Sequence, residues 1–286
     1  MLAEVMIRPS LIPPLLTATA MALSCAVLSV FVVSRRWAFI GEGIAHSGFG
    51  GAGTVWLLIL IFPSLGNEGR EWLPYCGVVV FCIATAIGIG YFTRSGKINS
   101  DAAIGIFLVA SLAWGILAQY IYRHVRGVDP VGWDTFLFGD MRGLSAQFAL
   151  GAVSLCVAVV AVVVGLGREI VAYAFDPTTA EASGVRVGFI HYLLMILVAL
   201  TIVIGVRLAG NVLVTALLVL PGATALMLCR TLRSTMVLSL AVALIGTVGG
   251  LCIHFWKPFI PTGPAIVLLL FGEFVIGYAV EKLGSR

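Results

Sequence analysis

Residues 189–229 read FIHYLLMILVALTIVIGVRLAGNVLVTALLVLPGATALMLC, and this stretch decides the fold class. It is apolar almost throughout, and Arg207 is its only charged residue. A run of about 20 apolar residues is long enough for a helix to cross the hydrocarbon core of a bilayer. The stretch therefore predicts two membrane-spanning helices, 189–206 and 208–229, with almost no connection between them.

The rest of the chain repeats this apolar pattern. Of its 286 residues, 60% are hydrophobic and 10% are charged, whereas soluble domains average about 25% charged residues. Too little polar surface is left to cover a soluble globule, and no segment outside the apolar runs is large enough for a soluble domain. We expect an all-α, polytopic helical membrane protein, with a single transmembrane domain over residues 1–286. About nine spans are predicted: 11–34, 38–62, 74–92, 101–122, 143–166, 189–206, 208–229, 234–255 and 264–281.

The charges and the cysteines exclude other classes of protein. The net charge of +4 is spread along the chain without a basic run suited to nucleic acid, so we expect no nucleic-acid partner. The six cysteines are scattered and form no C-x-x-C pair. They are therefore expected to be small buried apolar residues. No small-residue cleavage site and soluble domain follow the first apolar run, which we interpret as a retained span.

The basic residues predict the orientation of the chain. If every span crosses, ten of the 17 lysines and arginines fall on one side, and this side is expected to be cytoplasmic. The N-terminus then lies outside and the C-terminus inside. The connection Tyr122–Ser145 is mixed polar and aromatic and is expected to cap or border the bundle. A re-entrant segment within 123–142 would invert the later half.

A second stretch, WAFIGEGIAHSGFGGAG (37–53), carries a carboxylate and an imidazole into a span. Glu42 and His46 are four residues apart, so both side chains lie on one face of a helix. Carboxylate oxygen and imidazole nitrogen suit Zn²⁺, Mn²⁺ or Fe²⁺. His46 is expected near mid-depth, where an ionised carboxylate nearby costs about 2.5–3.5 kcal/mol on insertion scales and so needs a partner.

Two interpretations of this pair stay open on the residues alone. Glu42 and His46 are either ligands for an ion in transit, or a protonated Glu42 hydrogen-bonded to a neighbouring helix beside a satisfied core histidine. The glycines that follow allow neighbouring backbones to approach closely, so this face is expected to look into the bundle. They are Gly48, Gly50, Gly51 and Gly53.

Other polar residues in or near the spans are candidates for a pathway. Asp101 is either a carboxylate favoured by the dipole at a helix N-terminus or a pathway residue. Glu273 is either a protonated hydrogen-bond donor or a pathway residue. His191 and His254 lie near span ends and are expected to be interfacial, and His124 is expected in a loop.

The connection at about 175–188, FDPTTAEASGVRVG, carries its own helix signals. Asp176 suits the N-cap, Pro177 the first helical position and Gly184 the residue past the end. We expect a short helix over 178–183 in a cytoplasmic connection. It is either a docking element or an ordinary interfacial helix.

Absent motifs argue against an enzyme. The sequence has no G-x-x-x-x-G-K-[ST], so it is not expected to hydrolyse nucleotide by itself. It also lacks H-E-x-x-H and G-x-S-x-G, which argues against an intramembrane metalloprotease or serine hydrolase of familiar type.

Several stretches, taken in order, resemble the membrane permease subunits of bacterial ATP-binding-cassette (ABC) importers for zinc, manganese and iron. They cover most of the chain, and the run ending in LVLPGATA is specific. The stretches are GEGIAHSGFGGAG, similar to the family's G-D-x-x-x-H signature; FLFGD (136–140); FDPTTAEASGVRV; GVRLAGNVLVTALLVLPGATALML (205–228); and PTGPAIVLL (261–269).

The resemblance implies an importer half-pore in the bacterial cytoplasmic (inner) membrane. Two permease copies, identical or related, would pair on two cytoplasmic ATPase subunits and receive metal from an extracytoplasmic binding protein. No cofactor is expected to be bound permanently, and a divalent metal is the transported substrate. Glu42 and His46 map onto the positions of the signature that meet the ion. The residues implied in coupling to the ATPase are Asp176, Pro177, Ala180 and Gly184.

Two residues depart from the family's pattern. The family more often has Asp where this chain has Glu42, which leaves the metal preference open. Gly222 stands where alanine is usual and is expected to loosen the helix after Pro221. One alternative function is a stand-alone proton- or ion-coupled secondary transporter, with Glu42 and Glu273 as proton carriers. Another is an intramembrane metalloenzyme, which needs at least three converging protein ligands.

Overall fold

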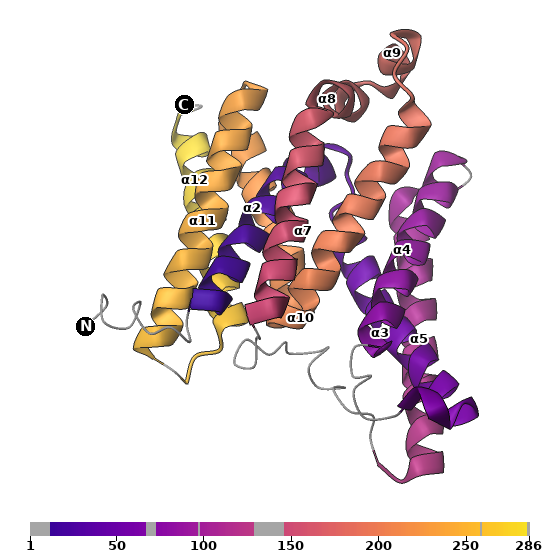
Figure 1. Cartoon of the computed structure of the whole chain (residues 1–286). Helices are drawn as coiled ribbons and strands as arrows, with labels where there is room; N and C mark the ends of the chain where they lie inside the picture. Colours follow the sequence, from indigo (N-terminus) through magenta and orange to yellow (C-terminus); the bar gives the residue numbers. More distant parts are fainter. Residues whose placement is uncertain (1–11, 67–72, 97, 129–145, 258, 285–286) are drawn as a thin grey trace.

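The computed structural model describes residues 12–66, 73–96, 98–128, 146–257 and 259–284, and within these ranges all regular structure is helical (Figure 1). Nine segments of the described residues are long and apolar enough to cross a membrane, as predicted. The helices are α2 (Ile12–Ser34), α3 (Ile40–Ile61), the 3₁₀ turn η2 (Pro63–Gly66), α4 (Leu73–Arg94), α5 (Ser100–Arg126), α7 (Ala146–Gly165), α8 (Gly167–Phe175), α9 (Pro177–Ala182), α10 (Val187–Leu228), α11 (Leu232–Trp256) and α12 (Thr262–Gly284).

The longest helix, α10, contains both spans of the opening stretch. Gly210 interrupts it with φ 78° and ψ 175°, a left-handed backbone conformation that favours glycine. Gly205 packs directly against the side chain of Val214, although nine residues of one straight helix would separate them by about 13 Å. The chain therefore folds back at Gly210, a few residues later than the boundary predicted at Arg207.

The second half of α10 also contains a proline, and α2 satisfies the backbone there. Pro221 has no N–H and disturbs the hydrogen bonds of its own helix. The Gly222 N–H donates to Ser29 Oγ of α2 at 2.8 Å. The loosening expected after Pro221 is not observed, because the helix continues to Leu228. Gly222 instead lets α2 approach, since a Cβ there would lie 2.5 Å from Ser29 Oγ.

The glycines of α3 lie where α4 and α5 pack against it, as expected. A Cβ on Gly51 would lie 2.5 Å from the carbonyl oxygen of Gly77 in α4. On the other side, a Cβ on Gly53 would lie 3.2 Å from Cα of Gly115 in α5. These three helices form one side of the bundle, α11 and α12 form the other, and α2 and α10 lie between them (Figure 1).

Helix α5 is longer than the sequence predicted. It continues to Arg126 and ends at Gly127, which has φ 74°. The connection predicted from Tyr122 therefore begins later, and His124 lies in the last helical turn and not in a loop. The basic residues that ended the apolar run are favoured at a helix C-terminus, which is why the helix goes on. The predicted FLFGD motif and most of the possible re-entrant segment lie outside the described residues.

Candidate functional site

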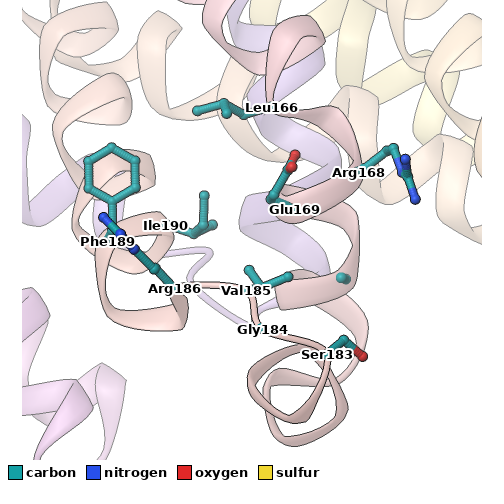
Figure 2. A pocket seen from close by; sticks show the side chains of 10 residues that line it. Leu166, Arg168, Glu169, Ser183, Gly184, Val185, Arg186, Phe189 and Ile190 are labelled. Atoms are coloured by element: carbon teal, nitrogen blue, oxygen red, sulfur yellow. The ribbon is translucent and has the colours of Figure 1, made fainter.

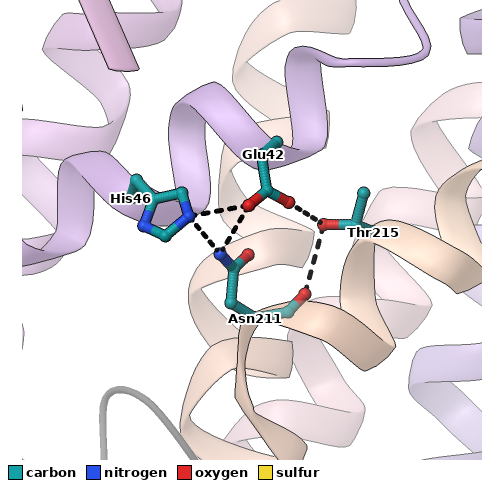
Figure 3. A network of polar contacts seen from close by, with 4 residues as sticks. All are labelled: Glu42, His46, Asn211 and Thr215. Atoms are coloured by element: carbon teal, nitrogen blue, oxygen red, sulfur yellow. Dashed lines mark hydrogen bonds and ion pairs between the residues drawn. The ribbon is translucent and has the colours of Figure 1, made fainter. Parts of the chain in front are cut away.

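Glu42 and His46 lie one turn apart near the start of α3. His46 Nε2 is 2.7 Å from Glu42 Oε1, and the two side chains are 20% and 34% exposed, respectively. We call these two residues the carboxylate–imidazole pair. The pair faces the second half of α10 (Figure 3).

Two residues of α10 complete the polar group. Asn211 Nδ2 is 3.3 Å from Glu42 Oε1 and 2.9 Å from His46 Nε2, and Thr215 Oγ1 donates to Glu42 Oε2 at 3.1 Å. Asn211 directly follows the break at Gly210, so a helix N-terminus, with its positive dipole end, begins beside the carboxylate. Neither residue was predicted from the sequence. Their i, i+4 spacing directly after a glycine was the available signal.

The protons available do not satisfy every atom of this group. One ring nitrogen either donates or accepts, so His46 Nε2 cannot donate to Glu42 and also accept from Asn211. His46 Nδ1 and Asn211 Oδ1 are buried and find no hydrogen-bond partner among the described residues. The alternative interpretation places Glu42 in hydrogen bonds with a neighbouring helix, beside a satisfied core histidine. Its first part agrees with the bonds from α10 to Glu42. Its second part does not agree with the unpartnered Nδ1 of His46.

The chemistry of these donors suits a loosely held cation. Two ligands of a tetrahedral zinc ion, each bound at about 2.0–2.1 Å, lie about 3.3 Å apart. The pair would thus have to separate by about half an ångström to bind such an ion. Within the described residues, no group of three or more His, Cys, Asp or Glu side chains could hold a metal. The metalloenzyme interpretation needs such a group.

The other predicted pathway residues lie apart from this pair. Asp101 is exposed in the first turn of α5, where the helix dipole favours a carboxylate. Glu273 lies on α12 facing Gly246 of α11, and its Oε2 is buried with no hydrogen-bond partner in the described part of the chain. His254 Nδ1 bonds to the Ile260 carbonyl at 2.6 Å near the end of α11.

The predicted coupling segment forms α9, one residue earlier than expected. Asp176 caps it by accepting from the N–H groups of Thr178 and Thr179, and Pro177 takes the first helical position. These bonds, those of Thr179 first, lower the pKa of the Asp176 carboxyl below its ordinary value. Gly184 follows the helix with φ 84°, as predicted.

A second helix, α8, precedes α9 and was not predicted. Its inward face buries Ile170, Tyr173 and Ala174, and Ala180 of α9 is also buried. Both helices lie at the same end of the bundle (Figure 1). Beside them, a groove of about 550 Å³ separates α8 from the start of α10 (Figure 2). Its lining includes Arg168, Glu169, Ser183, Arg186, Phe189 and Ile190.

A bundle of many spans with a polar pair at a broken helix is typical of membrane transporters. The model of the ABC 3 transport family matches residues 8–281 of this chain, so the chain belongs to that family. It is similar to the "Probable iron transport system membrane protein" of Haemophilus influenzae, with 30% identity over 95% of this chain and 94% of the relative. It is also similar to the "Manganese transport system membrane protein MntC" of Halalkalibacterium halodurans, with 29% identity over 92% and 85%.

A solved structure agrees with the fold. "PsaBC from Streptococcus pneumoniae in complex with Fab" has a TM-score of 0.77 and 27% identity, covering 97% of this chain and 95% of that chain. The protein is thus a multi-pass membrane permease of a bacterial ABC importer, and ATP is hydrolysed by a separate chain. The predicted family and transport role are confirmed, and membership decides against a stand-alone carrier.

Proposed function

We propose that this permease carries a divalent transition metal, which is manganese, iron or zinc, past the carboxylate–imidazole pair. One observation carries the proposal: Glu42, His46, Asn211 and Thr215 converge from two helices at the break of α10. The names of the relatives support manganese and iron, and an oxygen donor with an imidazole nitrogen suits all three metals.

The four residues have two different roles at this site. Glu42 and His46 replace part of the hydration shell of the ion, while Asn211 and Thr215 hold the carboxylate in place. Two ligands from one chain bind weakly, which suits an ion that must leave again. In an alternating-access cycle, movement of the ATPase subunits opens the path to one side at a time.

The partners follow from the same proposal. A cytoplasmic ATP-binding subunit docks on α9, whose capped N-terminus and buried Ala180 give it a fixed shape. A second permease copy, identical or related, faces the partly exposed pair, and an extracytoplasmic metal-binding protein delivers the ion. The metal is the substrate, and no cofactor is bound permanently.

The test is radiometal uptake by cells that contain the permease with its ATPase. Glu42→Ala or His46→Ala abolishes uptake, and copurification with the ATPase is unchanged. Glu281→Gln, which neutralises an exposed carboxylate in the last turn of α12, is the matched control and transports normally. Competition among the three metals then identifies the cargo. Normal import by both alanine variants would show that the site is wrong.

A further inference from the structure

A buried hydrogen-bond chain joins α8 to α10 and α4. Tyr173 Oη lies 2.6 Å from His191 Nδ1, and His191 Nε2 lies 2.9 Å from the Gly90 carbonyl oxygen. Because that carbonyl can only accept, Nε2 carries the proton, and Nδ1 accepts from the tyrosine hydroxyl. Tyr173 is 2% and His191 5% exposed, so His191 is not the interfacial histidine that its place near a span end predicted.

The connection between α2 and α3 closes around the same two side chains. The Arg35 guanidinium lies 4.6 Å from the centre of the Tyr173 ring and 5.7 Å from that of the Trp37 ring. Trp37, itself 3% exposed, meets His191 edge-on at 5.4 Å. We call Arg35, Trp37, Tyr173 and His191 the hub.

The backbone of this connection is held in one unusual shape. Arg36 has φ 59°, in the left-handed region that is costly for a residue with a side chain. The Arg36 N–H donates to the Val33 carbonyl and the Trp37 N–H to the Val32 carbonyl, which is a Schellman ending of α2. Glycine usually occupies this position, so surrounding contacts must fix the connection.

The hub links α9, where the ATPase is proposed to dock, to the carboxylate–imidazole pair. Tyr173 is on α8, directly before α9, while Trp37 is five residues before Glu42, or about 7.5 Å if measured as helix. The Ile40 N–H donates to the Trp37 carbonyl at 2.9 Å, so Trp37 is bonded to the first turn of α3. A displacement of α8 therefore has a continuous path of buried contacts to the turn that carries Glu42.

We propose that the hub couples movement of the ATPase to the carboxylate–imidazole pair, and that Tyr173 and His191 are its positioning residues. This inference rests on the proposed function. Burial raises the pKa of the Tyr173 hydroxyl, which stays protonated and keeps donating to His191. The hub residues are not part of the carboxylate–imidazole pair, so loss of the hub uncouples transport from hydrolysis and leaves the pair intact.

The experiment measures manganese uptake and ATP hydrolysis side by side in liposomes that contain the permease with its ATPase and are supplied with the extracytoplasmic metal-binding protein. Tyr173→Phe removes one hydroxyl and keeps the ring. The metal moved per ATP falls about fivefold, as expected for the loss of one hydrogen bond, while hydrolysis per assembled complex stays within about twofold. Tyr91→Phe is the matched control, because Tyr91 adjoins Gly90 but is exposed, and it keeps the normal ratio.

Trp37→Phe is a second variant, with the same expected fall, because the smaller ring withdraws its edge from His191. The hub assignment is overturned if both variants keep the normal ratio, or if uptake and hydrolysis fall in parallel in both. Iron and zinc are assayed beside manganese in the unaltered complex. If that complex moves none of the three metals, the proposed function is wrong, and so is the coupling role that rests on it.

Discussion

Replacing Gly222 by alanine should destabilise this chain, although the family pattern has alanine there. The new Cβ would lie 2.5 Å from Ser29 Oγ and 2.6 Å from the Ser29 backbone carbonyl, well inside ordinary contact distance. Overpacking of this kind costs about 1–3 kcal/mol. Weakening the bond from the Gly222 N–H to Ser29 costs about 1 kcal/mol more, and the better helix propensity of alanine returns about 1 kcal/mol. We expect a net loss of about 1–3 kcal/mol in the free energy of unfolding.

The assay is equilibrium unfolding of the purified chain in mixed detergent micelles, followed by tryptophan fluorescence. Gly151→Ala is the control, because a Cβ at Gly151 in α7 meets nothing within 4 Å. That variant should gain up to about 1 kcal/mol from helix propensity, so the two glycine replacements should shift stability in opposite directions. Equal stabilities for the two variants would refute the close approach of α2 and α10.

Two further predictions concern the site and the coupling segment. Asn211→Ala removes the bonds from Asn211 to the carboxylate–imidazole pair. The uptake rate at limiting metal should fall about tenfold, as expected for the loss of a hydrogen bond to a charged group. An unchanged uptake curve would contradict this role of Asn211. The lowered pKa of Asp176 means that its cap on α9 is fully present above the ordinary aspartate pKa of about 3.9 and is lost as the pH falls through the lower folded value. Protection of the Thr179 amide in hydrogen exchange, corrected for intrinsic rates, should therefore fall on acidification. In the Asp176→Asn variant the same amide should stay protected at every pH, because asparagine caps equally well and does not titrate. An unaltered pH profile in that variant would argue against the carboxylate as the cause.

The spans were predictable because each depends on local composition. An apolar run of about 20 residues has few structures open to it in a bilayer, since the backbone must satisfy its own hydrogen bonds. The short helix α9 was predictable for a similar reason: Asp176, Pro177 and Gly184 act within one or two turns. Helix α8 was missed because it is short and amphipathic and follows directly on a span.

The contacts between distant segments were not predictable. Asn211 reaches Glu42 across 169 residues of sequence, and His191 reaches Gly90 across 101. Hydropathy gives the length of a span but not which neighbours cover it. For this reason His191 looked like an interfacial residue, although α4 and α8 bury it.

The break in α10 explains why a carboxylate is stable where Glu42 lies. Irregular backbone within a membrane protein is tolerated where protein covers it or where it lines a polar cavity. At Gly210 the chain reverses and starts a new helix, whose first turns present Asn211 and Thr215 to the carboxylate. An uninterrupted α10 would offer neither a helix N-terminus nor this pair of donors at the same point. The glycine break and the acidic residue of α3 thus depend on each other, and any movement that shifts the second half of α10 must also change the hydrogen bonds that Asn211 and Thr215 make to Glu42 and His46.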